Sequence, residues 1–495
     1  MGEKSIIIIG AGMGGLAAGV YGRLNGYRTQ IFEAHTTPGG QCTSWTRKGY
    51  TFDACIHHLF GCGPSSRLHQ LWTELGAMPR EMVVTEECTA VQDVDGRLFR
   101  DYYDPERLEQ HLMELSSADA AVIKDYVAGT VRISKVDVLG ELMMGSPLAL
   151  AAALPRLLPL FKYFKPTVDA YAERFTDPFL RRAFALLVYS LSGAPLLIHL
   201  ARHGLAITGA LKWPVGGARE FATSIERRYV ELGGEIHYRQ KVTKILVEHD
   251  EAVGVVLEDG SQHRADVVIS NADGRTTIMD MLEGRYGGEQ FRGYCAEPPD
   301  EVNWALHVFL GVNRDLSQEP SALVMLLDRP VTIAGHTTSN IEMQMYGCDP
   351  TMAPPGKGVI KVELVSSYTY WKELAADRSR YEEEKQRVAD QVIDILERRF
   401  AGIRGQLEVV DVPTLLTWER FMGGVHGFNN MPVKKMTMAG SLGPRSWLTT
   451  LPGLGHFYFA GVWATSAGAL FANALSGRRV IEQICRNEGG RFVTG

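Results

Sequence analysis

The sequence has little excess charge of either sign, and this argues against nucleic acid as its main partner. Its 495 residues include 51 lysines and arginines and 57 aspartates and glutamates, which gives a formal net charge of −6. Proteins that bind nucleic acid carry a basic excess that neutralises phosphates. We therefore expect no nucleic-acid partner.

The chain is also short of cysteine, and its cysteines form no metal-ligand pattern. There are seven, an odd number, and none belongs to a C-x-x-C pair. This usage is typical of a reducing compartment and offers no zinc framework. Cys55 and Cys62 are near each other in sequence, but buried free thiols are a simpler interpretation than a disulfide. We expect no metal.

Long uncharged apolar runs are lacking as well. No segment reaches the roughly 20 apolar residues that a membrane-spanning helix needs. The apolar run at residues 6–9 resembles the core of a signal peptide, but it leads directly into a glycine turn with a structural use. We therefore expect no cleaved targeting segment. The length suits two or three domains around a sizeable core.

The first 40 residues carry the strongest pattern that is present. Residues 6–9 are a β-branched run, as in a strand buried on both faces of a parallel sheet. Glycines then follow at G-x-G-x-x-G spacing, and a second strand ends in an acid. Such a turn brings backbone amides and a helix N-terminus to a pyrophosphate, and the acid takes the ribose hydroxyls. The residues that we expect to bind the dinucleotide here are Gly10, Ala11, Gly12, Gly14, Gly15, Glu33 and Ala34.

A second glycine turn follows this acid. Pro38 precedes Gly39 and Gly40, and Gln41 and Cys42 come next. An NAD enzyme does not need this loop, whereas an extended FAD does. With these residues the sequence resembles the flavoprotein family of amine oxidases, protoporphyrinogen oxidases and carotenoid desaturases. Members usually have Gly–Gly–Arg, so Gln41 is a departure. The resemblance implies that Gly39, Gly40, Gln41 and Cys42 contact FAD.

Two later segments strengthen the resemblance. Residues 233–272 resemble the block in phytoene desaturases and retinol saturases that forms a strand, a hairpin around Asp259–Gly260 and a buried strand. Residues 457–485 match the closing strand, turn and helix of the family, whose helix N-terminus faces the flavin pyrimidine. The absence of a cysteine between residues 442 and 475 predicts non-covalent FAD. The resemblance implies cofactor contacts from Val242, Asn271, Gly461, Val462, Leu470 and Phe471, although many relatives carry an acid in place of Val462.

Candidate catalytic residues lie in residues 49–61, which resemble the segment that leads toward the flavin ring in carotenoid desaturases. His57 and His58 are the side chains there that can move protons near neutral pH. Desaturation of a polyene removes a hydride and then a proton, and saturation reverses these steps. We predict that His57 and His58 provide this proton route. Hydrogen bonding of the two histidines within a packed loop is the alternative.

Two apolar stretches suggest a lipophilic partner. Residues 136–171 are rich in leucine, are interrupted by four prolines and end among basic residues. Broken amphipathic helices with basic edges suit a bilayer interface, and a buried helical cap is the alternative. Residues 186–211 could form core or line a tunnel for a hydrocarbon. We expect a cytoplasmic protein with peripheral contact to the inner face of the cell membrane.

Together these features predict an α/β protein. We expect a discontinuous Rossmann-like FAD-binding domain of the glutathione-reductase type (residues 1–64, 212–290 and 445–495), a helical substrate and membrane-association region (65–211) and an inserted α+β substrate domain (291–444). The expected function is an FAD-dependent oxidoreductase that desaturates, saturates or isomerises a lipophilic polyene or isoprenoid.

The electron partner could be a quinone, oxygen or a nicotinamide, because no second G-x-G-x-x-G follows a strand. An amine- or porphyrinogen-oxidase-like enzyme is one alternative function. A non-enzymatic prenyl- or lipid-binding escort protein of the same fold is another.

Overall fold

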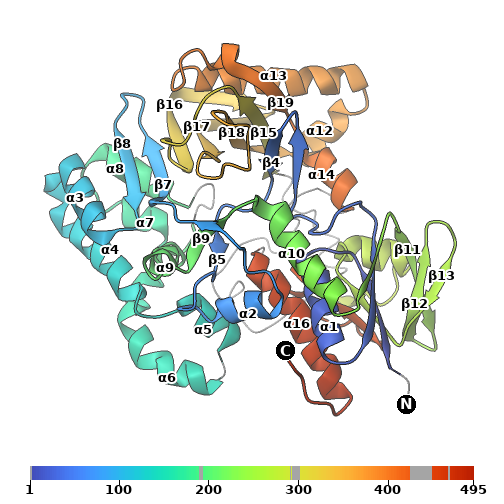
Figure 1. The fold of residues 1–495 in the computed structure, drawn as a ribbon. Helices are drawn as coiled ribbons and strands as arrows, with labels where there is room; N and C mark the ends of the chain where they lie inside the picture. Colours follow the sequence, from blue (N-terminus) through green and yellow to red (C-terminus); the bar gives the residue numbers. More distant parts are fainter. Residues whose placement is uncertain are drawn as a thin grey trace.

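The computed structural model describes residues 3–145, 147–188, 193–289, 291, 302–423, 449–465 and 469–495. Helices and strands alternate in the N-terminal, middle and C-terminal parts of the chain, and a separate antiparallel sheet carries its own helices (Figure 1). The prediction of a mixed α/β protein is confirmed. The domain boundaries stay a prediction.

A five-stranded parallel sheet combines strands from three distant parts of the sequence. Its order is β10-β2-β1-β14-β20, and every neighbouring pair is parallel. β1 lies at the centre with four buried isoleucines, as its β-branched run predicts. The strands are β1 (Ser5–Ile9), β2 (Arg28–Glu33), β10 (Glu235–Tyr238), β14 (Val267–Ser270) and β20 (Phe457–Phe459).

Both faces of this sheet are covered, and the alternation along β1 decides what each face packs against. Ile6 and Ile8 belong to the core formed with three helices, whereas Ile7 and Ile9 belong to the core under a small antiparallel sheet. The hairpin of that sheet turns at Gly260, where φ is +86°. The helices are α1 (Met13–Leu24), α10 (Gly217–Glu231) and α16 (Leu470–Asn487), and the small sheet contains β11 (Val242–Glu248), β12 (Glu251–Leu257) and β13 (Gln262–Arg264).

A seven-stranded sheet forms the upper part of the molecule in Figure 1. Its order is β19-β15-β18-β17-β16-β7-β8, and all pairs are antiparallel except β16–β7. β7 and β8 come from the first part of the region 65–211, residues 65–126, where the sequence predicts mixed helix and strand. The strands are β7 (Glu87–Gln92), β8 (Leu98–Tyr102), β15 (Val302–Val312), β16 (Ala322–Ile333), β17 (His336–Met345), β18 (Gly358–Ser367) and β19 (Leu407–Asp411).

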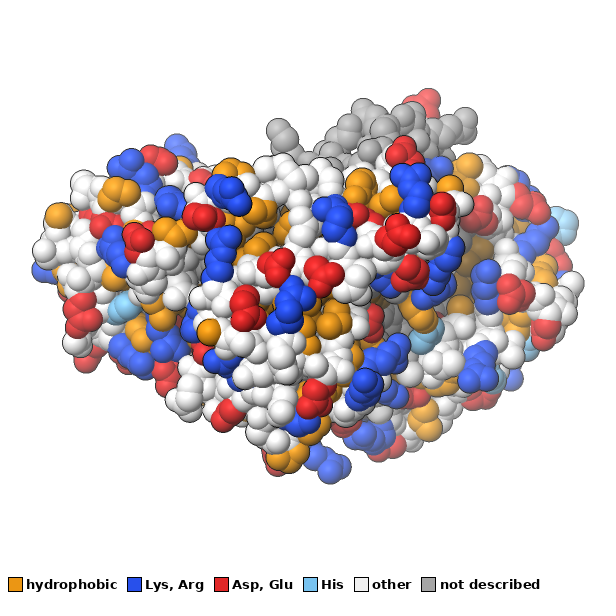
Figure 2. Space-filling model, turned by 90° about the horizontal axis from the view of Figure 1, so that it is seen from above, with side chains coloured by type: hydrophobic (Ala, Val, Ile, Leu, Met, Phe, Trp, Pro, Cys, Tyr) orange, Lys and Arg blue, Asp and Glu red, His pale blue; other side chains and the backbone are white. Residues whose placement is uncertain are grey.

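Three helices pack on the seven-stranded sheet. One face of the amphipathic helix α13 is buried, with Val388, Val392 and Leu396 in the shared core. Its charged face is exposed, and basic and acidic side chains are interspersed over the described part of the surface in Figure 2. These helices are α12 (Tyr368–Leu374), α13 (Arg378–Leu396) and α14 (Leu415–Met422).

Short helices make up most of the region on the left of Figure 1. The apolar stretch at 186–211 contains α9, whose leucines at 196, 197 and 200 are buried. No helix within the described ranges is long and apolar enough to cross a bilayer. The helices are α3 (Pro105–Leu115), α4 (Ala120–Ile133), α5 (Val138–Met144), α6 (Pro147–Leu157), α7 (Val168–Ala172), α8 (Pro178–Ala185) and α9 (Leu196–Ile207).

Smaller elements connect these layers. The antiparallel pair β3–β4 precedes the histidine segment, and β9 pairs with both β5 and β6. Their bounds are β3 (Ser44–Arg47), β4 (Tyr50–Asp53), β5 (Leu59–Phe60), α2 (Leu68–Glu74), β6 (Met82–Val83) and β9 (Leu211–Pro214).

Candidate cofactor site

A cavity of about 820 Å³ opens where the carboxyl ends of β1, β2 and β14 meet the turn after β20. This volume is in the range of small-molecule and cofactor pockets, and the edge of a parallel sheet is where such ligands bind. The lining comes from both ends of the chain and from its middle. The predicted residues that line it are Gly10, Gly12, Gly14, Glu33, Ala34, Gly39, Gly40, Gln41, Cys42, Val242, Asn271, Gly461, Val462 and Leu470.

The first glycine turn places the N-terminus of α1 at this cavity. Gly10 has φ +92°, a conformation that favours glycine, and a Cβ on Gly15 would collide with the carbonyl oxygen of Gly10. A Cβ on Gly14 would collide with the backbone nitrogen of Gly461. The α1 helix begins after Gly12 with no side-chain cap, so its first amides are available to an anion.

Glu33 connects the two glycine loops. Its carboxylate accepts hydrogen bonds from the backbone N–H groups of Ala11 and His35, each at 2.7 Å. The Gly39 N–H in turn donates to the Ala11 carbonyl at 2.8 Å. The acid after β2, the turn after β1 and the Gly39–Gly40 loop therefore form one wall of the cavity.

The C-terminal wall contains a polar group suited to a ligand. The Gly461 N–H donates to Ser476 Oγ at 2.7 Å, which fixes the turn after β20 to α16. One turn into α16, Asn473 lines the cavity, and its Oδ1 atom is buried with no hydrogen-bond partner among the described residues. A buried acceptor without a donor costs free energy, so Oδ1 is a candidate contact for a bound molecule.

Three predicted cofactor residues lie outside the lining. Ala11 faces Glu33 through its backbone, Gly15 packs against the Gly10 carbonyl, and Phe471 is buried beside Leu470. The position of Ala11 and Gly15 agrees with structural roles in the turn. For all the predicted residues, contact with a cofactor stays a prediction.

Several lining residues were missed by sequence reasoning. Asp273 and Thr276 lie in the segment just after Asn271. Small polar residues that follow the buried strand β14 were therefore a signal in the sequence for this part of the lining. The Asp273 carboxylate accepts a hydrogen bond from Thr276 N–H at 2.8 Å, and burial raises the pKa of Asp273. Residues 419–423 at the end of α14 also line the cavity, and only tertiary contacts bring them there. The continuation of this stretch, residues 424–437, which could also border the cofactor by its sequence, lies outside the described residues.

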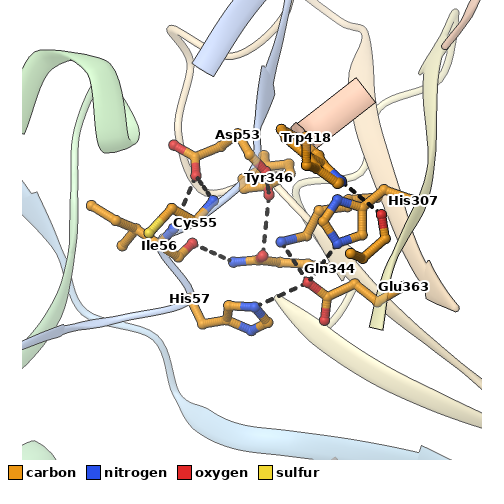
Figure 3. A network of polar contacts seen from close by, with 11 residues as sticks. Asp53, Cys55, Ile56, His57, His307, Gln344, Tyr346, Glu363 and Trp418 are labelled. Atoms are coloured by element: carbon orange, nitrogen blue, oxygen red, sulfur yellow. Dashed lines mark hydrogen bonds and ion pairs between the residues drawn. The ribbon is translucent and has the colours of Figure 1, made fainter. Parts of the chain in front are cut away.

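His57 and His58 do not line this cavity, although Cys55 does. The Nε2 atom of His57 lies 3.2 Å from Glu363 Oε1 in the seven-stranded sheet (Figure 3). His58 is buried, with Nε2 3.2 Å from Thr85 Oγ1. Burial, and then the charge of Arg202, hold the pKa of His58 well below its usual value, so it is neutral at physiological pH. A catalytic role for either histidine stays a prediction.

A second polar cluster is buried in the helical region. Asp101 Oδ1 accepts a hydrogen bond from Tyr126 at 2.9 Å, and its Oδ2 lies 2.9 Å from His203 Nε2 and 3.1 Å from His199 Nε2. The thiol of Cys88 is within 4.8 Å of the ligand atoms of Asp101 and His199. Three side chains thus satisfy the buried carboxylate of Asp101.

Comparison with known proteins places the chain in a family. Residues 13–485 match the model for "Flavin containing amine oxidoreductase". The chain is 26% identical over 522 residues to prolycopene isomerase from Arabidopsis thaliana, an alignment covering 98% of this chain and 83% of the relative. It is 27% identical over 327 residues to a lycopene-forming phytoene desaturase from a Paracoccus species, covering 62% of this chain and 61% of the relative.

The fold is similar to that of solved structures. An oxidoreductase from Methanosarcina mazei matches 97% of this chain and 100% of its own with a TM-score of 0.61 at 19% identity. This level of identity shows the fold alone. The family model covers nearly the whole chain, from the start of α1 at residue 13 to residue 485 in the closing helix α16, and membership implies a flavin cofactor. The protein belongs to the flavin-containing amine oxidoreductase family.

Proposed function

We propose that the protein is an FAD-dependent oxidoreductase that desaturates, saturates or isomerises carbon–carbon bonds of a lipophilic polyene or isoprenoid. The observation that carries this proposal is the alignment with prolycopene isomerases over 98% of the chain. Phytoene desaturases, which by name act on a related polyene, align with the chain as well.

The residues around the cavity suit an extended FAD. The N-terminus of α1 suits the pyrophosphate, Glu33 suits the ribose hydroxyls, and Val242, which lines the cavity, would border the adenine. At the other end Asn473 offers a buried acceptor from the first turn of α16. We propose a Rossmann-like FAD-binding domain around the parallel sheet and a non-covalent FAD. When bound, the flavin supplies a site that accepts or donates a hydride.

The chain's own residues then have three tasks. The cavity walls must hold the cofactor, the seven-stranded sheet must hold the substrate beside it, and one side chain must move a proton. Cys55 borders the cavity, and two residues later His57 contacts the seven-stranded sheet, so the segment containing the histidines runs between the two. This placement supports a proton route at His57.

The test is a comparison of substrate classes. Purified protein should be yellow and release FAD on denaturation. Oxidised and reduced enzyme should be mixed without oxygen with cis and trans polyenes, and separately with amines and porphyrinogens. We expect flavin absorbance changes or new polyene isomers with polyenes alone. Turnover of an amine or porphyrinogen would favour that alternative, and a colourless protein that stays colourless with added FAD would favour a lipid-binding escort role.

We also propose a cytoplasmic location with peripheral membrane contact through one face of α6 and the turn after it. Four apolar side chains there are exposed: Leu148 (81%), Leu154 (48%), Leu158 (57%) and Phe161 (50%). The other face, which includes Leu157 and Leu160, is buried against the protein, so the segment is anchored. The basic residues Arg156 and Lys165 are exposed beside the apolar face and suit anionic headgroups.

A further inference from the structure

One face of the seven-stranded sheet is charged at its centre. The strand register places His307, Glu363 and Glu342 side by side on β15, β18 and β17, and the next row contains Lys361 and Gln344. Residues opposite each other, or two apart on one strand, share a face. Lys361 is fully buried, and His307, Glu342 and Gln344 are also buried. Buried sheet faces are normally apolar, so this grouping requires a reason.

The carboxylate of Glu363 is the centre of this face. Its Oε1 atom lies 2.9 Å from Lys361 Nζ, 3.2 Å from His57 Nε2 and 3.9 Å from His307 Nε2. Burial alone would raise the pKa of Glu363, but the charges of Lys361 and His57 and the hydrogen bond from His57 hold it well below its usual range. Glu363 is therefore ionised at neutral pH and accepts a hydrogen bond from His57.

The segment that carries His57 is fixed from both sides. Gln344 Nε2 donates to the Ile56 carbonyl at 3.1 Å, and the Tyr346 hydroxyl donates to the Asp53 carbonyl at 2.9 Å (Figure 3). The Asp53 carboxylate accepts hydrogen bonds from Cys55 and Ile56 N–H groups. The backbone on either side of Cys55, which lines the cofactor cavity, is thus tied to the charged face.

A second connection joins this face to the cavity. The indole of Trp418 on α14 packs against His307 with ring centroids 5.5 Å apart, and its Nε1 donates to the Ala305 carbonyl at 2.6 Å. The residues that follow Trp418, from 419 to 423, line the cavity. The charged face therefore contacts two different segments that border the cofactor site.

We infer that His57 exchanges the proton with the substrate and that Glu363 is its positioning residue, with Lys361 fixing the charge of the carboxylate. The inference rests on the proposed function. In desaturation, bound FAD would accept the hydride from one substrate carbon, and the proton of the adjacent carbon would pass to His57. The electron pair of the second C–H bond becomes the new double bond. The imidazolium then faces the Glu363 carboxylate, and saturation runs the same transfers in reverse.

The test compares H57Q, E363Q, the double variant and a matched control in holoenzyme. Glu408→Gln is the control, because Glu408 is a carboxylate on the same sheet that also contacts a lysine and a tyrosine, but it lies at the edge strand. Single-turnover rates would be measured against pH with a polyene that the wild type converts. We expect H57Q to be slower by about 100-fold or more, E363Q by about 10-fold with a shifted pH profile, and E408Q to match the wild type.

The double variant separates positioning from a structural effect. If Glu363 acts through His57, the double variant should be no slower than H57Q alone. A readout independent of turnover is the NMR signal of the His57 imidazole, identified by its loss in H57Q. Because His57 contacts Glu363, the chemical shift of this signal should change in E363Q and stay in place in E408Q.

Three results would overturn the inference. They are an unchanged single-turnover rate in H57Q, full additivity in the double variant, and an unchanged His57 NMR signal in E363Q. If E363Q does not fold, Glu363→Asp replaces it in the test, because it keeps the negative charge. The rate of this variant should keep the wild-type pH profile. A wild type that converts no polyene at all would instead reject the proposed substrate class.

Discussion

The carboxylate of Glu33, at the end of β2, accepts a hydrogen bond from the backbone N–H of Ala11, in the turn after β1, at 2.7 Å. The two residues are 22 positions apart, and the parallel pairing of β1 and β2 brings them together. The acid therefore shapes the wall of the cavity, and we propose that its carboxylate also binds the ribose of the cofactor.

Glu33→Gln should weaken FAD binding more than it weakens the fold. The amide keeps the size of the side chain but loses the charge that strengthens hydrogen bonds to ribose hydroxyls and backbone amides, which are worth about 1.5–3 kcal/mol each. We expect FAD affinity to fall about 10- to 100-fold, measured by dialysis of the apoprotein against FAD. Glu231→Gln on the exposed side of α10 is the control, and equal affinities in the two variants would contradict a ribose contact.

Gly14→Ala should disrupt the contact between the first turn and the closing turn. Its Cβ would collide with the backbone nitrogen of Gly461, which cannot move without breaking its hydrogen bond to Ser476. We expect about 1–3 kcal/mol of lost stability and loss of bound flavin, measured by thermal unfolding and by absorbance. Gly405→Ala has open space around its Cβ and should change stability by less than about 0.5 kcal/mol. A stable, yellow G14A protein would show that the two turns can separate.

The buried cluster around Asp101 predicts loss of stability in acid. Burial alone would raise the pKa of Asp101. The neighbouring His203 and His199 lower it by more, so the pKa of Asp101 lies below its usual range. Asp101 thus contributes stability above its unfolded pKa of about 4 and loses it as pH falls. Burial lowers the pKa of His199 in the folded protein. As pH falls below about 6.5, His199 is therefore protonated in the unfolded chain before it is protonated in the folded protein, and stability begins to fall.

Asp101→Asn is the variant that tests this cluster. We expect a loss of about 3–5 kcal/mol at pH 7, because one partner of a buried charged group is removed, and a smaller difference from the wild type at pH 4 and below. Urea unfolding at several pH values measures both. Asp95→Asn, on an exposed turn, should match the wild type. A difference that is constant with pH would rule out ionised Asp101 as its source.

The exposed apolar face of α6 predicts binding to anionic vesicles. Replacing Leu154 and Phe161 together by glutamate removes apolar area and adds negative charge, so the fraction of protein that floats with vesicles should fall several-fold. Val410→Glu changes an exposed apolar residue on the edge strand β19 and serves as the control. Equal flotation of both variants, or no flotation of the wild type, would assign the face of α6 another role.

Local patterns were enough to place most secondary structure around the site. The run at residues 6–9, the glycine spacing and the acid at 33 predict β1, the turn, α1 and β2, because each depends on neighbours in sequence. The helix α16 and the strands β14 and β20 are likewise close to the segments predicted from the family resemblance.

The residues that complete the site could not be read in the same way. Residues 419–423 reach the cavity through the packing of α14 on the seven-stranded sheet, and Glu363 reaches His57 through strand register across a separation of 306 residues. Register and helix packing depend on many weak long-range contacts, which leave no local signal in the sequence. The same reasoning applies to β7 and β8, because the sequence predicts mixed helix and strand at 65–126 but not the pairing of β7 with β16.

By itself, the sequence determined the glycine turn after β1 and the acid that ends β2, because glycine, charge and apolar alternation act on the local backbone. It also carried the resemblance to the family. Only the tertiary structure decided which distant side chains share the cavity, and which carboxylate the His57 imidazole contacts. Those partners are selected by the free energy of burying the chain as a whole, which no single stretch of residues specifies.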